Sequence, residues 1–277
     1  MRKKLAILSL VLAILFSLYG TISVVTFHNN ASFSPDYEMA DLTYILEKEE
    51  FSDEDYKTLF YQTGLGPFAI DSLKGKADFA ETVKEYQQNF FSKGEIACIR
   101  EAITTNMEHF VDSNGNYVSG FKMFTPKEGY VLIMESSHSF GWRHGHAGRV
   151  VKNGKVLEAP IIGQPSQKFQ LSVWSQYPSF VMLRLKDATD DELKKIASDA
   201  EKYLDGIIYN PIAGVFDKEQ GKKPDYVQCA YLVWYAFYNQ GIDIDSDGGN
   251  IVTVNDIKES DLFEVVQIYG YNPADFW

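Results

Sequence analysis

A histidine, a glutamate and a cysteine in this chain have the types and surroundings of a thiol nucleophile site. His146 stands in the run Gly-His-Ala-Gly, Glu158 follows twelve residues later, and Cys229 opens an apolar run that reaches Trp234. A thiol is a weak nucleophile until a neighbouring base makes it a thiolate, and a carboxylate can hold that base in the useful tautomer. We therefore interpret Cys229 as the nucleophile, His146 as the base and Glu158 as the group that orients the base.

The position of Cys229 at the start of a predicted helix favours this interpretation. A helix is predicted from Cys229 to Gln240, and Gly241 is a typical helix stop. The positive end of the helix dipole stabilises a thiolate placed there. The alternative is a buried structural cysteine, which is common on apolar helices.

The hairpin that carries His146 and Glu158 offers a test of the pairing. Strands are predicted over 146–151 and 155–159, joined by a turn at Asn153-Gly154. With a two-residue turn, Glu158 would face Arg149 and lie on the opposite side of the sheet from His146. The triad needs a longer loop or a bulge that slips the register by one residue, and we predict that slip. A surface pair between Arg149 and Glu158 is the alternative.

Metal and cofactor sites have weaker support. His138 and His144 could join His146 and Cys229 around zinc, but no tight Cys/His cluster accompanies them. The turn that begins at Asp243 opens like a calcium loop but lacks the closing acid of such a loop. We expect an acidic turn there, no metal, and no cofactor.

The other cysteine, Cys98, lies in the apolar run Ile96 to Ile99 and is predicted to be a buried small hydrophobe. A bridge between Cys98 and Cys229 is an alternative that would consume the proposed nucleophile. With two cysteines in the chain, the fold does not depend on a disulfide framework.

Composition limits the classes of function. The chain has 277 residues, of which 45% are hydrophobic, enough for one good core and a smaller accessory core. Its formal net charge is −12, which repels phosphate backbones and makes nucleic acid an unfavourable partner.

The N-terminal segment, 1–27, is predicted to be a signal peptide or a membrane anchor. Arg2, Lys3 and Lys4 precede an uncharged apolar run over 5–27. A positive start before an apolar stretch is typical of export, and the run is also long enough to anchor the chain in a membrane. We expect the body to be extracytoplasmic, either secreted or anchored at the cell envelope.

Three further segments follow. A linker is predicted over 28–38, a helical extension over 39–118 and the catalytic domain over 119–277. The extension has a capped helix start at Ser52, and helical spacing is predicted over Ala77 to Phe91 and Glu95 to Phe110. A further strand is predicted over Phe180 to Leu185, and a capping box of Thr189 and Glu192 is predicted to open a helix. Strands followed by helices, with at least one hairpin, predict an α+β domain. The extension could shape the substrate site, dock a partner or serve as a packing layer.

Three motifs in the order His, Glu, Cys resemble one known group of proteins. The runs Gly141 to Gly148, Leu157 to Ala159 and Gln228 to Trp234 are similar to the circularly permuted branch of the NlpC/P60 papain-like superfamily. Within it, the chain most resembles the YiiX/YebB-like cysteine hydrolases, relatives of bacterial cell-wall peptidases and, more distantly, of lecithin:retinol acyltransferase. The likeness covers about Lys127 to the C-terminus.

This resemblance implies a permuted papain-like fold, a helix packed on a small antiparallel sheet, with the triad between them. It also implies that Tyr209 lies near the site, because relatives carry a tyrosine before the cysteine helix. Trp142 and Gln228 are further candidates for the wall of the pocket. Tyr130 departs from the family pattern, in which Asp usually follows the glycine that opens the first strand, so the local turn there is in doubt.

The function implied is that of a cysteine amidase or peptidase that works through an acyl-enzyme, with a peptide or acyl group as substrate. Peptidoglycan stem peptides are the expected substrate, given the expected location outside the cytoplasmic membrane. The alternatives are a lipid-acting acyltransferase or thioesterase on the same fold, or a non-catalytic binding module of the cell envelope. The oligomeric state is left open.

Overall fold

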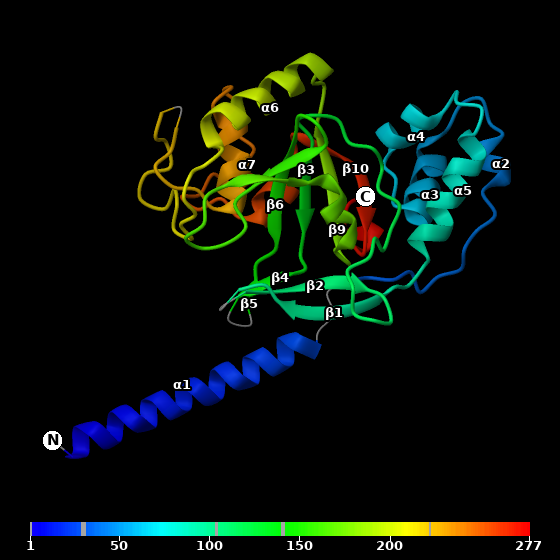
Figure 1. Ribbon diagram of the computed structural model, residues 1–277. Helices are drawn as coiled ribbons and strands as arrows, with labels where there is room; N and C mark the ends of the chain where they lie inside the picture. Colours follow the sequence, from blue (N-terminus) through cyan, green and yellow to red (C-terminus); the bar gives the residue numbers. More distant parts are fainter. Residues whose placement is uncertain (1, 29–31, 103–104, 140–141, 222) are drawn as a thin grey trace.

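The computed structural model describes residues 2–28, 32–102, 105–139, 142–221 and 223–277. They form two antiparallel sheets with helices packed around them (Figure 1), so the predicted α+β class is confirmed. Part of the predicted linker, 29–31, and Gly141 in the first motif lie outside the described residues.

The larger sheet has six strands in the order β10-β9-β3-β6-β7-β8, and every neighbouring pair is antiparallel. The strands are β3 (Val131–Met134), β6 (His146–Val151), β7 (Lys155–Glu158), β8 (Gln167–Gln170), β9 (Phe180–Leu185) and β10 (Phe263–Tyr269). A short 3-10 helix, η1 (Leu171–Gln176), connects β8 to β9. Strands β6 and β9 have the predicted bounds, because their β-branched and apolar residues suit a buried sheet.

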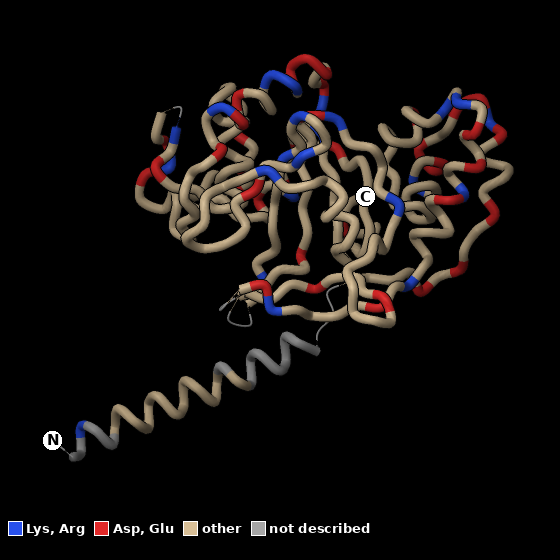
Figure 2. Tube along the Cα trace, in the orientation of Figure 1, with Lys and Arg blue, Asp and Glu red and all other residues tan. Residues whose placement is uncertain are grey.

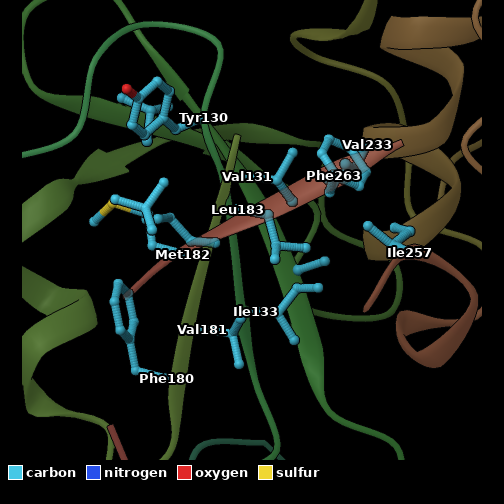
Figure 3. Close-up of a cluster of buried hydrophobic side chains, with 14 of the residues drawn as sticks. Tyr130, Val131, Ile133, Phe180, Val181, Met182, Leu183, Val233, Ile257 and Phe263 are labelled. Atoms are coloured by element: carbon cyan, nitrogen blue, oxygen red, sulfur yellow. The ribbon is translucent and has the colours of Figure 1, made fainter. Parts of the chain in front are cut away.

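Two helices, α6 (Asp190–Leu204) and α7 (Cys229–Tyr238), pack against each other and against β6. The predicted capping box of Thr189 and Glu192 opens α6. Residues Cys229 to Phe237 of α7 are all buried, as expected for a helix that is apolar on all sides. Figure 3 shows the core between these layers, where Val233 of α7 lies near Val131 of β3 and Phe263 of β10.

The smaller sheet corrects the sequence prediction for the second half of the extension. Residues Glu95 to Phe110 were expected to be helical, and this is wrong: β1 (Glu95–Arg100) and β2 (Thr105–Val111) pair as an antiparallel hairpin. The apolar run around Cys98 is too short to distinguish a helix from a strand by its period, and cross-strand pairing decides the outcome. Strands β4 (Ser137–Ser139) and β5 (Trp142–Arg143) complete this sheet in the order β1-β2-β4-β5.

The first half of the extension is helical as predicted. It contains α2 (Thr43–Leu46), α3 (Asp53–Thr63), α4 (Pro67–Leu73) and α5 (Phe79–Phe90). Ser52 caps α3 in a capping box with Asp55, and Gly64 ends it with a φ of 70°. Helix α4 packs on β10, and Leu65 pairs with Gln267 of that strand. The extension therefore shares one hydrophobic core with the rest of the chain.

The N-terminal apolar run forms α1 (Arg2–His28). Among the helices that the structure describes, none combines the length and apolar character needed to cross a membrane. Near the C-terminus, α8 (Val254–Lys258) packs on α7, and η2 (Pro273–Asp275) contacts α3. Charged side chains follow the helices and loops at the outside of the molecule, while the central strands carry few of them (Figure 2).

Candidate active site

The hairpin of β6 and β7 has the register that the triad requires. Val151 pairs with Lys155, so the loop holds three residues, 152–154, and Glu158 lies opposite Gly148. Both Asn153 and Gly154 in this loop adopt a φ of 62°. The predicted slip of one residue is confirmed, because Gly148 is two positions from His146 and therefore lies on the same face of β6.

His146 and Glu158 meet in a buried hydrogen bond. The His146 Nε2–H donates to Glu158 Oε2 over 2.8 Å, and both side chains are almost completely buried. With Nε2 engaged by the carboxylate, Nδ1 is the ring nitrogen left for a second partner. The carboxylate thus fixes both the tautomer and the orientation of the imidazole.

The surroundings of Gly148 explain why a glycine follows His146 and Ala147. A Cβ atom at position 148 would lie 2.8 Å from Trp174 Cζ2 and 3.0 Å from Glu158 Cγ. Both distances are shorter than ordinary van der Waals contact, so a side chain here would displace the two residues. Glycine at this position lets Glu158 and Trp174 close over the strand beside the histidine.

Trp174 is a functional candidate that sequence reasoning missed. Its indole Nε1–H donates to Glu158 Oε1 over 2.8 Å, and its ring stacks on that of His146 with centroids 5.7 Å apart and planes 17° apart. Trp174 is fully buried in η1. In the sequence it reads as an ordinary core aromatic, and only the folded arrangement places it beside the acid.

Cys229 is the first residue of α7. Gln228 caps the helix: its Oε1 accepts from the Ala230 N–H, and its Nε2 donates to the Val252 carbonyl over 2.6 Å. Gln228 was expected to line a pocket, and both ends of its amide are instead engaged in holding the helix start. Cys229 is buried, with 7% of its surface exposed.

The thiol and the imidazole interact directly, and their pKa values move in opposite directions. Burial alone would lower the pKa of His146, but hydrogen bonds with Cys229 and Glu158 and the charges of both groups raise it to about 10. Burial would likewise raise the pKa of Cys229. The hydrogen bond and positive charge of His146, together with the backbone N–H groups of Ala147 and Ala230, lower it instead. Both directions favour the thiolate and imidazolium form of the pair over the neutral form.

Of the two aromatic residues expected near the site, one lies there. Tyr209 is half-buried and bridges to Val227 just before the cysteine helix, and burial and the negative charge of Cys229 raise the pKa of its phenol. Trp142 lies on β5 in the smaller sheet with 76% of its surface exposed. It is therefore not part of an enclosed wall.

Arg149 does not pair with Glu158. It lies opposite Leu157, on the other face of β6 from His146, and its guanidinium packs 4.0 Å from the centroid of the Phe237 ring. The alternative of a surface pair between Arg149 and Glu158 is therefore wrong, because the slipped register turns the two side chains to opposite faces.

The histidines considered for zinc point to different partners. Nε2 of His138 lies 3.6 Å from Cys98 Sγ, and His144 bonds to Ser139 Oγ and to the Gly145 carbonyl. His146 is engaged by Glu158 and Cys229, so the four residues considered as an alternative zinc site are not assembled around one point.

Within the described part of the chain, one group of three potential ligands lies close enough to share a metal ion, namely Asp245, Asp247 and Asp256. Lys218 Nζ forms an ion pair with Asp245 and donates to the Gly249 carbonyl over 2.6 Å. An ammonium group of the chain itself thus neutralises part of this acidic turn.

Cys98 contrasts with Cys229. It is half-buried rather than fully buried as expected, and both cysteines are free thiols. Burial and the charge of Glu108 raise the pKa of Cys98, while burial and the charge of Arg143 lower that of its neighbour His138. This second thiol and imidazole therefore stay neutral, and Cys98 lacks the activation that Cys229 has.

Comparison with known proteins finds a similar solved structure but no matching family model or curated protein. Among solved structures, the metalloprotein yiiX from Escherichia coli O157:H7 is similar over 52% of this chain and 97% of its own length. The identity is 15% and the TM-score 0.41, a likeness on which no argument about fold or chemistry rests.

Proposed function

We propose that this chain is a cysteine hydrolase that cleaves an amide bond through an acyl-enzyme. The observation that supports this most strongly is the single chain of contacts from Cys229 through His146 to Glu158. A thiolate paired with an oriented imidazolium is the activated nucleophile that acyl transfer needs. The order of the three residues along the chain supports a permuted papain-like domain.

In the proposed reaction, Cys229 Sγ attacks the substrate carbonyl carbon and forms a tetrahedral intermediate. The backbone N–H of Cys229, at the start of α7, is placed to donate to the developing oxyanion. His146 then gives its proton to the leaving amine as the C–N bond breaks. Water attacks the thioester carbonyl carbon while His146 accepts a proton from that water, and the C–S bond then breaks to release the free acid and regenerate the Cys229 thiolate beside the protonated imidazole.

The proposed substrate is a peptide of the cell envelope, with peptidoglycan stem peptides as the first candidate. This step rests on the basic and apolar pattern of residues 1–27 and on the resemblance of the motifs to cell-wall peptidases. Location at the cell envelope, by export or anchoring, is part of the same proposal.

An acyl lipid is the second candidate substrate, and one surface feature favours it. Tyr209 and Val227 pair in an isolated β-bridge. The residues directly before them, Ile208 and Tyr226, are exposed by 44% and 49%. Pro165, also exposed, pairs with Ile208. An exposed apolar row next to the segment that leads into Cys229 suits a substrate with an acyl chain.

Incubation with purified peptidoglycan and, in parallel, with phospholipid vesicles distinguishes the two, with mass spectrometry of products and of the intact protein as the readout. We expect new amino and carboxyl ends in the peptides and a thioester adduct on Cys229. Release of fatty acid without peptide cleavage would select the lipid substrate instead. Binding of peptidoglycan with no product and no adduct, equal in wild type and Cys229→Ala, would identify a non-catalytic binding module.

A further inference from the structure

Trp174 makes contacts with Glu158 and His146 that the triad alone does not require. The carboxylate of Glu158 has two oxygens: His146 donates to Oε2 and the Trp174 indole donates to Oε1, each over 2.8 Å. The carboxylate is thus held from both sides and cannot rotate without losing one of two hydrogen bonds. All three side chains are buried, so water cannot replace a lost donor readily.

The Trp174 ring also contacts the base itself. It stacks nearly parallel on the imidazole of His146, with planes 17° apart, and thereby limits the tilt of the ring about its bond to the carboxylate. One residue therefore restrains both the acid and the base, from the face of β6 on which they lie.

The turn that carries Trp174 is anchored by two residues that directly follow the extension, Ser119 and Gly120. The Gly120 N–H donates to the Ser175 carbonyl over 2.9 Å, and Ser119 Oγ donates to Ser175 Oγ over 2.9 Å. Tyr177, at the end of the same turn, packs edge-on against the indole with centroids 5.7 Å apart. These contacts fix η1, so the indole meets Glu158 at a set position.

We propose that Trp174 is a positioning residue of the active site, which holds Glu158 and His146 in the orientation in which the imidazole meets Cys229. This rests on the proposed function, because it assigns the means by which that site is kept in order. It acts through Glu158 and His146 and touches no reacting atom.

The test is the rate at which iodoacetamide modifies Cys229 as a function of pH, in wild type, Trp174→Phe and Trp234→Phe. Phenylalanine keeps an aromatic ring but removes the N–H donor. Trp234 is a matched control, because it is equally buried and its indole donates to a different acid, Asp243, over 2.7 Å. Thermal unfolding of each variant measures the loss of stability that is common to both.

In Trp174→Phe we expect the acid limb of the Cys229 profile to move up by about one pH unit, because a less ordered imidazolium stabilises the thiolate less. The rate at pH 6 should then fall about tenfold, the lower end of the range for a hydrogen bond to a charged group. Trp234→Phe should keep the wild-type profile.

Equal profiles in Trp174→Phe and wild type, or equal shifts in the two variants, would overturn the positioning role while leaving the proposed function intact. A wild-type Cys229 that reacts only at the high pH of an ordinary thiol would remove both, since no charged pair would exist to be positioned.

Discussion

Replacement of Cys229 by alanine is expected to abolish turnover and to leave the fold in place. Alanine removes one heavy atom from the first residue of α7, while the cap from Gln228 and the apolar face of the helix remain. Without a nucleophile no acyl-enzyme forms, and we expect a loss of at least about 10⁴-fold in kcat, the size seen when a nucleophile is removed from such a site. Product formation and thermal unfolding, measured side by side, check both parts.

Cys229→Ser tests whether the thiol itself is required, because the change in size is small. A serine hydroxyl fits the same space but is far less acidic than a thiol, so the imidazole of His146 cannot keep it ionised. We expect a loss close to that of Cys229→Ala. Cys98→Ala is the matched control and should retain activity, because the pKa of that thiol is raised and it stands outside the triad. Activity of Cys229→Ser equal to wild type would refute the mechanism.

Replacement of Glu158 by glutamine has the second largest expected effect. A glutamine side chain has one acceptor oxygen and one NH₂ group, whereas Glu158 accepts from both His146 and Trp174. In either orientation of the amide, its NH₂ group faces the N–H donor of His146 or of Trp174. We expect kcat/KM to fall by about 10- to 100-fold, the range for a lost hydrogen bond to a charged group.

The pH dependence of kcat/KM in Glu158→Gln should also change, in a direction set by the pKa of His146. The hydrogen bond and negative charge of Glu158 help to raise the pKa of His146 to about 10, so their loss lowers that pKa. The protonated imidazole is needed to deliver a proton to the leaving amine, and the alkaline limb of kcat/KM should therefore move to lower pH. Glu264→Gln serves as the control. It removes a carboxylate that is paired with Arg184 and lies on β10, the edge strand farthest from β7 and β8. An alkaline limb that stays in place in Glu158→Gln would show that Glu158 does not act on the base.

The parts of the site that the sequence predicted are those with local signals. The capping boxes at Ser52 and Thr189 and the strand that carries His146 depend on neighbouring residues, and all three are confirmed. The register of the hairpin was predicted by requiring Glu158 and His146 to share a face, a constraint that a longer loop or a bulge satisfies, and the structure has the longer loop.

The parts that the sequence did not predict depend on pairing between distant segments. The run around Cys98 became a strand because β2 lies beside it, and no periodicity in six residues could show this. Trp174 reaches Glu158 across a separation of 16 residues through a turn that Ser119 and Gly120 anchor, and Gly148 leaves the space that this approach requires. Such contacts are set by the fold and leave no mark in the local sequence.

The most direct test of the central claim compares the two cysteines of one folded chain. Native protein is treated with iodoacetamide over a range of pH, and peptides containing Cys229 and Cys98 are quantified by mass spectrometry. Because the pKa of Cys229 is lowered and that of Cys98 is raised, Cys229 should react at a lower pH than Cys98, which should react only above about pH 8.5, the ordinary value for a thiol. If Cys229 is inert in the native protein, or follows the same alkaline curve as Cys98, then it is not the thiolate on which this mechanism depends.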